Sequence, residues 1–186
     1  MFLRLIGYSD SNYGDKLDER WRATTGFCWF LESVVVSWKS KRQDTTADST
    51  FKAEMIAAHA CFAEGRWLRD LCAELGIIDP LEPSQFWCDN KSTIFNLCSE
   101  TMSWKQTHLS TKFFACSDLV TDGYFLPDHV AGEDNPADMF TKGLPSGPLE
   151  KHSLTLGMRQ LAKSAYLAVR RARFCLADLV SSFGLF

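Results

Sequence analysis

The amino-acid sequence predicts an α/β fold, a five-stranded mixed sheet with three antiparallel N-terminal strands, flanked by helices. Three strand-like segments precede the first helical one, and two further short apolar segments alternate with helical segments after it. With 186 residues, 46% hydrophobic and 23% charged, the chain has the length and composition of one globular domain with a core. We therefore expect a folded domain over residues 1–158 and a basic, amphipathic helical tail over residues 159–186.

The first three predicted strands lie in the N-terminal quarter of the chain. The second and third are rich in aromatic and β-branched residues, which favour strands. Only Glu32 and Ser33 separate these two, so we expect an antiparallel hairpin. Three cations in residues 39–43 close the third strand, either as a solvated sheet edge or as a phosphate-contacting surface. The three strands are expected at 3–9, 24–31 and 34–38, with a polar loop at 12–21.

Apolar residues at helical spacing predict a long helix over residues 50–75. Asp48, Ser49 or Thr50 can cap its start, Gly65 is a candidate interruption, and Gly76 ends it in the left-handed conformation that glycine tolerates. The remaining elements are expected to be a strand at 85–88, helices at 90–97 and 109–120, a strand at 124–130, a helix starting at 133 and a closing helix at 149–158.

Charge is unevenly distributed along the chain. The formal net charge is -3 at pH 7, yet residues 159–186 carry five cations and one acid, so the body is more acidic than the whole. An acidic body is not typical of a nucleic-acid binder, but it suits a protein that gathers carboxylates around a divalent cation. For the tail, packing onto the domain or a frayed appendage is favoured over a nucleic-acid arm or a membrane-surface helix.

Seven cysteines are spread through the sequence without a CxxC pair. Reduced, buried thiols of an intracellular protein are favoured over a zinc site or a disulfide framework. No apolar run reaches the length of a membrane span, and residues 1–6 are too short for a signal peptide, so we expect no membrane partner.

Four acidic residues are candidate metal ligands because of their positions in the predicted elements. Asp10 comes after an apolar run on the first strand, in the middle of a sheet, where an unpaired carboxylate is costly to bury unless a cation offsets its charge. Glu54 lies on the first helix, Asp89 ends the fourth strand, and Asp138 lies in the first turn of a late helix. Each acid alone can be a solvated or capping carboxylate, above all Asp138. Together they predict a divalent-metal site.

Seven motifs over residues 6–158 resemble, in order, the ribonuclease H domain of copia-type retrotransposon polyproteins. The resemblance implies a ribonuclease H-like fold. The motifs are GYSDSN at 7–12, VVVSWKSKRQ at 34–43, STFKAEMIAA at 49–58, WLRDLCAELG at 67–76, WCDNKSTI at 87–94, THLSTKFF at 107–114 and EDNPADMFTKGLP at 133–145.

The resemblance implies a magnesium-dependent endoribonuclease that cleaves the RNA strand of RNA:DNA hybrids during reverse transcription. Its catalytic and metal-binding residues would be Asp10, Glu54, Asp89 and Asp138, with two Mg²⁺ ions about 4 Å apart and Mn²⁺ as an alternative. Asp10 would bridge both ions, Glu54 and Asp89 would hold the one that activates water, and Asp138 would help to hold the other. Mg²⁺ takes hard oxygen ligands, as carboxylates are.

Candidate nucleic-acid contacts lie beside these acids and after the hairpin. For Asn12 and Asn90 a turn or helix cap explains the residue at least as well. His129 lies on the fifth predicted strand, so a structural role is favoured over a proton shuttle. The candidates are Ser11, Asn12, Lys41, Arg42, Gln43 and Asn90.

Two departures from the family keep other functions open. Phe51-Lys52-Ala53-Glu54 retains only the second of two acids usual in the helix motif, and the motif at 107–114 lacks an acid and an arginine. One alternative is a catalytically silent remnant that keeps the fold and at most binds nucleic acid or a polymerase domain. Another is a nuclease or exchange enzyme acting on DNA. We expect a monomer in a cytoplasmic particle or the nucleus, with any reverse transcriptase a separate polypeptide.

Overall fold

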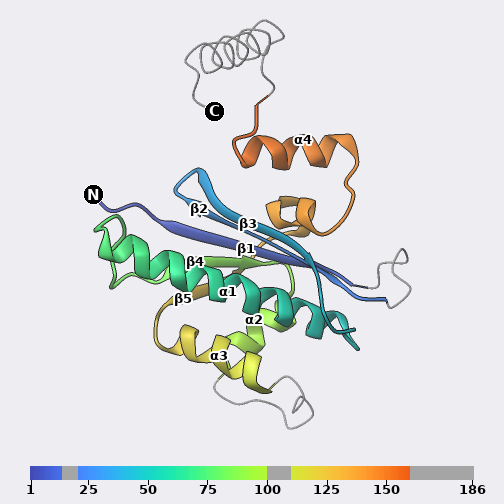
Figure 1. The fold of residues 1–186 in the computed structure, drawn as a ribbon, viewed down its shortest axis with the longest axis horizontal. Coiled ribbons are helices and arrows are strands. Elements are labelled where there is room, and N and C mark those ends of the chain that lie inside the picture. The colour runs from blue at the N-terminus through green and yellow to red at the C-terminus, as the bar shows by residue number, and fades with distance from the viewer. Residues whose placement is uncertain (14–20, 100–109, 160–186) are drawn as a thin grey trace, which may run out of the picture.

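The computed structural model describes residues 1–13, 21–99 and 110–159, which build one five-stranded mixed sheet with helices on both faces (Figure 1). The strand order is β3-β2-β1-β4-β5. β1, β2 and β3 pair antiparallel, whereas β4 runs parallel to β1 and to β5. The predicted fold class is confirmed. The strands are β1 Leu5–Asn12, β2 Thr24–Leu31, β3 Val34–Arg42, β4 Ser84–Cys88 and β5 Phe125–His129.

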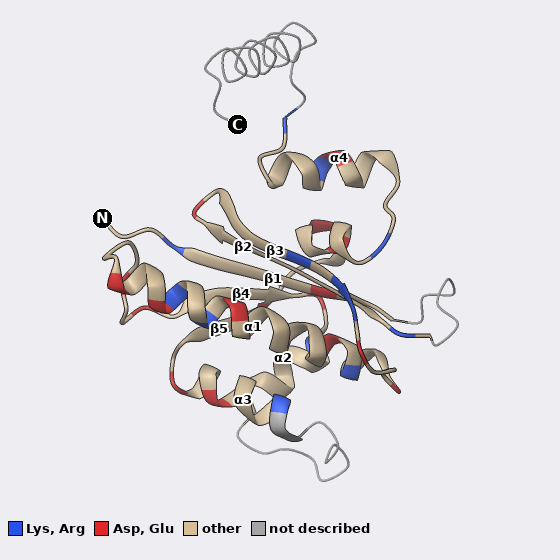
Figure 2. Cartoon of the chain, viewed as in Figure 1, with Lys and Arg blue, Asp and Glu red and all other residues tan. Residues whose placement is uncertain are grey.

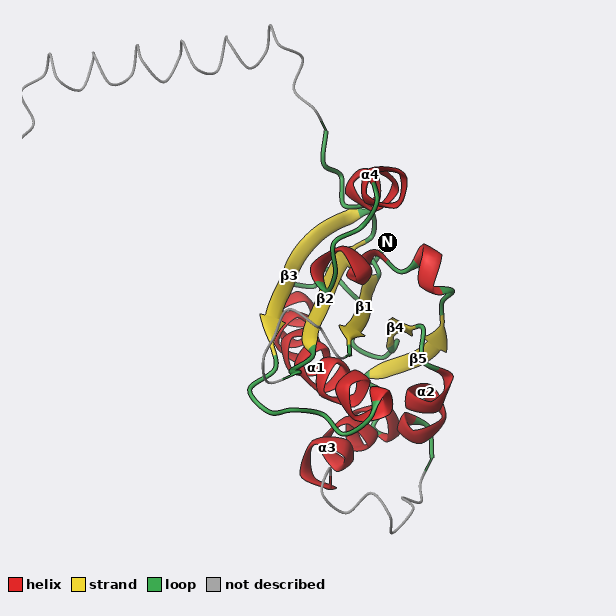
Figure 3. Ribbon diagram, turned by 90° about the vertical axis from the view of Figure 1, so that its right-hand side faces the viewer, coloured by secondary structure: helices red, strands yellow, loops and turns green. Residues whose placement is uncertain are grey.

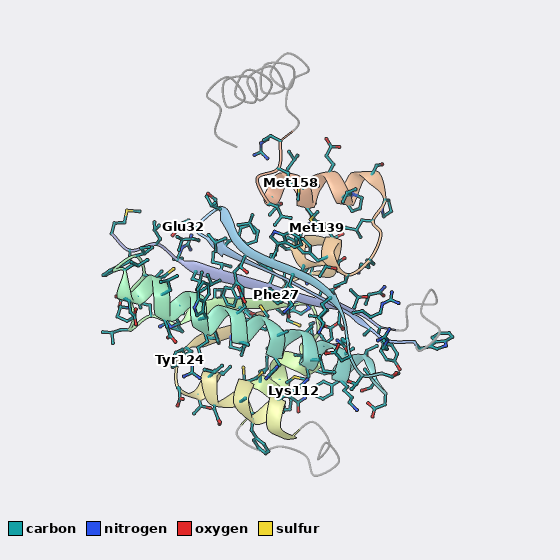
Figure 4. The ribbon with its side chains drawn as sticks, in the orientation of Figure 1. Phe27, Glu32, Lys112, Tyr124, Met139 and Met158 are labelled. Atoms are coloured by element: carbon teal, nitrogen blue, oxygen red, sulfur yellow. The ribbon has the colours of Figure 1, made fainter. Side chains whose placement is uncertain are left out.

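Helices cover the two faces of the sheet unequally (Figure 3). One face carries α1, α2 and α3, and the main apolar core fills the space beneath them, including Phe27. The other face carries two short 3₁₀ turns and α4, over a smaller cluster that Met139 covers (Figure 4). The helical elements are α1 Thr50–Glu74, α2 Lys91–Leu97, α3 Ser110–Thr121, η2 Gly132–Asp134, η3 Pro136–Phe140 and α4 Ser146–Thr155.

Two strands run further than the sequence predicts. β1 continues to Asn12, since Asp10 pairs with Gly26 and Asn12 with Thr24 on β2. β3 continues to Arg42, which pairs with the same Thr24. The cations of residues 39–42 therefore lie within the edge strand instead of closing it (Figure 2). The helix predicted to start at residue 133 is also different. The chain there forms two short 3₁₀ turns, η2 and η3, before α4 begins.

The ends of α1 agree with the sequence. Ser49, one of three predicted caps, accepts a hydrogen bond from the Lys52 backbone N–H at 3.2 Å. Gly76 follows the helix with a φ of 67°, the left-handed conformation expected of it.

Among the described cysteines all six are free thiols, and only Cys98 is exposed. None of the described helices is both long and apolar enough to span a membrane. Of the predicted tail at 159–186, residues 160–186 lie outside the described residues.

The side chain of Trp29 explains the glycines at positions 7 and 65. Its side chain is fully buried, and its indole N–H donates to the Cys61 carbonyl oxygen at 3.0 Å. A Cβ on Gly7 would lie 2.5 Å from the indole ring, and a Cβ on Gly65 would lie 2.1 Å from it. Gly65 therefore does not interrupt α1, as the sequence suggested. It lets the helix pass close to the indole ring.

Replacing Gly65 with Ala is expected to destabilise the domain by about 1–3 kcal/mol through overpacking against Trp29. Helix propensity alone predicts the opposite sign, a gain of about 1 kcal/mol. Urea unfolding monitored by circular dichroism measures the change. Ala63→Gly, at an exposed position of the same helix, reports the propensity effect without the clash. A Gly65→Ala protein more stable than wild type would contradict the close contact.

Candidate functional site

Four acidic side chains from four separate elements meet at one end of the sheet. Asp10 lies on β1, Glu54 on α1 and Asp138 on η3, and Asp89 directly follows β4. Because β1 and β4 are parallel, with Ser9 opposite Cys88, the residues that follow, Asp10 and Asp89, lie side by side.

The distances between these groups are short enough for shared ligation. Oxygens of Asp10, Asp89 and Asp138 lie within 4.8 Å of one another, and so do ligand atoms of Glu54, Cys88 and Asp89. The two groups share Asp89. All four acids that the sequence singled out are thus brought together, and the bridging role assigned to Asp10 stays a prediction.

Glu54 is held by the backbone of the strand that carries Asp10. The Ser11 N–H donates to Glu54 Oε1 at 3.3 Å, and the Glu54 side chain is buried. Its second oxygen, Oε2, is buried without a hydrogen-bond partner among the described residues. A buried carboxylate oxygen without a donor is costly unless something else binds it.

Asn135 fastens η3, and with it Asp138, to β1. The side chain of Asn135 is fully buried, and its Nδ2 donates to the Ser9 carbonyl oxygen at 2.9 Å. Its Oδ1 accepts the Ala137 backbone N–H at 3.1 Å, which begins the turn that carries Asp138. Sequence reasoning assigned no role to Asn135.

Two further residues at the site were missed from the sequence, Thr141 and Lys142. The Thr141 hydroxyl donates to the Asp10 carboxylate and lies 3.0 Å from the Asp138 carbonyl oxygen. Lys142 Nζ lies 2.9 Å from Asp138 Oδ2. Their spacing from Asp138 could have indicated them. Residues three and four positions after an acid in a helical segment lie on the same face of the helix as that acid.

Burial dominates the electrostatics of the acids. It raises the pKa of Asp10 from 3.8 to about 6; the Thr141 hydroxyl and Lys142 oppose this rise, and Asp138 and Asp89 add to it. Burial, with the charges of Asp10 and Asp89, raises the pKa of Glu54 to about 9. Burial also raises the pKa of Asp89. Each shift disfavours the charged carboxylate, and a bound cation would reverse it.

The residues present fit a divalent cation with oxygen ligands. Asp138 Oδ1, like the second oxygen of Glu54, is buried and has no hydrogen-bond partner among the described residues. Carboxylate oxygens are the ligands that Mg²⁺ and Mn²⁺ prefer. Burial raises the pKa of the Cys88 thiol, so this sulfur stays protonated and is a poor ligand.

One predicted nucleic-acid contact, Gln43, is wrong. The side chain is buried, and its Nε2 donates to Thr25 Oγ1 at 3.1 Å and to the Ala53 carbonyl oxygen at 2.9 Å. Gln43 therefore ties the start of α1 to β2. The sequence placed it in an exposed cationic run because the helix that covers it follows only later in the chain.

The other predicted contacts divide by accessibility. Ser11 is buried, and Asn90 caps α2 by accepting the Thr93 N–H at 3.0 Å, which is the alternative weighed for it. Lys41 is exposed and pairs with Asp44 at 3.1 Å. Asn12 and Arg42 are half-buried, and both pair with Thr24 across the sheet. His129 ends β5, as predicted, with an exposed side chain.

Comparison with known proteins finds several retrovirus-related Pol polyproteins of transposons among the relatives of this chain. The chain is 31% identical over 155 residues to the retrovirus-related Pol polyprotein from transposon TNT 1-94 of Nicotiana tabacum, covering 83% of this chain and 11% of the relative. It is 27% identical over 163 residues to the Pol polyprotein from transposon RE1 of Arabidopsis thaliana, covering 87% of this chain and 11% of the relative. The chain thus spans about a ninth of these relatives' length. No family model matches it.

Several of the solved structures similar to the chain are ribonucleases H. LC11-RNase H1, isolated from compost by a metagenomic approach, superposes with a TM-score of 0.54 at 15% identity, over 74% of this chain and 92% of that chain. A crystal structure of LC11-RNase H1 in complex with an RNA/DNA hybrid gives a TM-score of 0.51 at 14% identity, over 74% and 94%. At such low identity the likeness concerns the fold.

Proposed function

Because the chain is a homologue of the Pol polyproteins of copia-type retrotransposons and has the fold of a ribonuclease H domain, we propose that it is an Mg²⁺-dependent endoribonuclease cleaving the RNA strand of RNA:DNA hybrids. The observation that carries this proposal is the convergence of Asp10, Glu54, Asp89 and Asp138 from four elements. A related fold, that of LC11-RNase H1, is seen with an RNA/DNA hybrid.

The four acids would hold two Mg²⁺ ions, or Mn²⁺ in their place. Bound there, the ions would activate a water and stabilise the leaving oxygen of an in-line phosphodiester hydrolysis. The chain's own part is to hold the ligands in place. The Thr141 hydroxyl orients the Asp10 carboxylate, and the Ser11 N–H orients that of Glu54. Asn135 anchors the turn that carries Asp138.

A hybrid would be recognised by its shape and by the 2′-hydroxyls of its RNA strand, with little reading of the bases. The predicted contacts that keep exposed surface are Lys41 and Arg42 on the edge strand, Asn12 at the end of β1 and Asn90 at the start of α2. We place the activity in reverse transcription, beside a reverse transcriptase domain, in a cytoplasmic particle or the nucleus.

The test is cleavage of a labelled RNA:DNA hybrid with Mg²⁺, for the wild type and for Asp89→Asn. The wild type is expected to cleave, and the variant to lose at least about a hundredfold in rate, because a metal ligand is gone. Asp118→Asn, at an exposed position of α3, is the matched control and should cleave normally.

Each outcome decides between the functions considered. Full activity in Asp89→Asn would show that Asp89 is not a ligand of the catalytic metal. A wild type without cleavage in either Mg²⁺ or Mn²⁺ would favour a silent remnant. Duplex DNA and duplex RNA assayed alongside decide the substrate class, and cleavage of duplex DNA alone would overturn the hybrid as substrate.

A further inference from the structure

A lysine lies among the carboxylates, and the chemistry proposed above does not use it. Lys142 Nζ contacts Asp138 Oδ2 at 2.9 Å, while 41% of the Lys142 side chain remains exposed. The charge of Lys142 also acts on the carboxylates of Asp10 and Asp89. This ammonium group is therefore within electrostatic reach of three of the four proposed metal ligands.

The turn after Asp138 puts the lysine there. The Lys142 backbone N–H donates to the Asp138 carbonyl oxygen at 3.2 Å, so the two side chains lie one helical turn apart. Thr141, one residue earlier, donates to Asp10. This turn therefore directs the Thr141 hydroxyl to Asp10 and the Lys142 ammonium to Asp138.

We propose that Lys142 competes with the divalent cation for Asp138. Its ammonium offsets the buried negative charge while the site holds no metal, and it lowers the affinity for an incoming cation. The inference rests on the proposed function, since it requires these carboxylates to bind metal.

The contacts of Asp138 support competition. One oxygen, Oδ2, is taken by Lys142, and the other, Oδ1, is buried without a partner among the described residues. A divalent ion on this carboxylate would lie close to the ammonium, and like charges at such distances repel strongly in a partly buried site. Lys142 can move away, because its flexible stem is already partly in solvent.

The experiment measures Mn²⁺ binding to the full chain by calorimetry, without nucleic acid. Lys142→Met is expected to bind Mn²⁺ about tenfold more tightly than the wild type, because the competing charge is gone. Lys142→Arg keeps the charge and should bind like the wild type. Circular dichroism checks folding, and Lys142→Gln replaces the methionine variant if that one does not fold.

Lys52 provides a matched control. It forms the same kind of i,i+4 pair, with Asp48 at 3.3 Å, two residues before Glu54. Lys52→Met should leave Mn²⁺ affinity within about twofold of the wild type, since that ammonium pairs outside the acidic cluster.

The outcomes separate this inference from the proposed function. Unchanged or weaker Mn²⁺ binding in Lys142→Met, with a wild type that binds Mn²⁺, overturns competition and leaves the metal site standing. An arginine variant that binds as tightly as the methionine variant also overturns it, because the charge would then not matter. A wild type that binds no Mn²⁺ contradicts the proposed function itself.

Discussion

Asp10→Asn is expected to reduce cleavage of an RNA:DNA hybrid by roughly a thousandfold, because the carboxylate proposed to bridge two metal ions is lost. The same change should stabilise the metal-free protein. Burial and the neighbouring acids raise the pKa of Asp10 to about 6, so its ionised form opposes folding above that pH. At about pH 8, above both the ordinary and the raised pKa, the expected gain is of the order of 3 kcal/mol, since one pKa unit corresponds to about 1.4 kcal/mol.

The two opposite effects are measured on one preparation. Hybrid cleavage is followed with Mg²⁺, and urea unfolding is followed with a chelator present. Asp128→Asn, on an exposed position of β5, controls for the loss of an aspartate as such and should change neither quantity appreciably. A variant that is inactive but less stable than the wild type would mean that Asp10 supports the fold, and the case for it as a metal ligand would weaken.

Metal-free protein is expected to lose stability as the pH rises from about 5 to about 9. The folded-state pKa values of Asp10 and Glu54, about 6 and about 9, lie above their ordinary values of 3.8 and 4.5. The folded state therefore binds more protons than the unfolded state in this range. The stabilisation by protonation is complete below the ordinary values and is lost as the pH passes through the raised ones.

Each of the two groups can lower the free energy of unfolding by at most about 1.4 kcal/mol per pH unit within its window. Chemical unfolding at several pH values, with chelator and with Mg²⁺, measures the slope. Mg²⁺ should flatten it, because a cation favours the ionised carboxylates. Glu54→Gln should flatten the upper part of the curve without metal. Stability that rises between about pH 6 and 9 in chelator would contradict buried, protonated acids at this site.

Much of the fold and part of the site could be predicted from local patterns. Asp10 and Asp89 each come after a short apolar run, and Glu54 lies in the first turns of a helix whose N-cap can be recognised, so their elements could be predicted. Gln43 shows where local patterns fail. Its neighbours are cations of an exposed strand, yet its own side chain is covered by α1, which begins seven residues later.

The sequence by itself determined which residues can carry charge into the domain and which segments become strands or helices, because apolar periodicity, caps and glycines act over a few residues. Tertiary structure alone decided which side chains share a space. Thr141 reaches Asp10 across 131 residues of chain, and Gly65 meets Trp29. These contacts depend on the strand order β3-β2-β1-β4-β5 and on η3 closing over β1 and β2. Such packing is set by the whole core, and no local pattern encodes it.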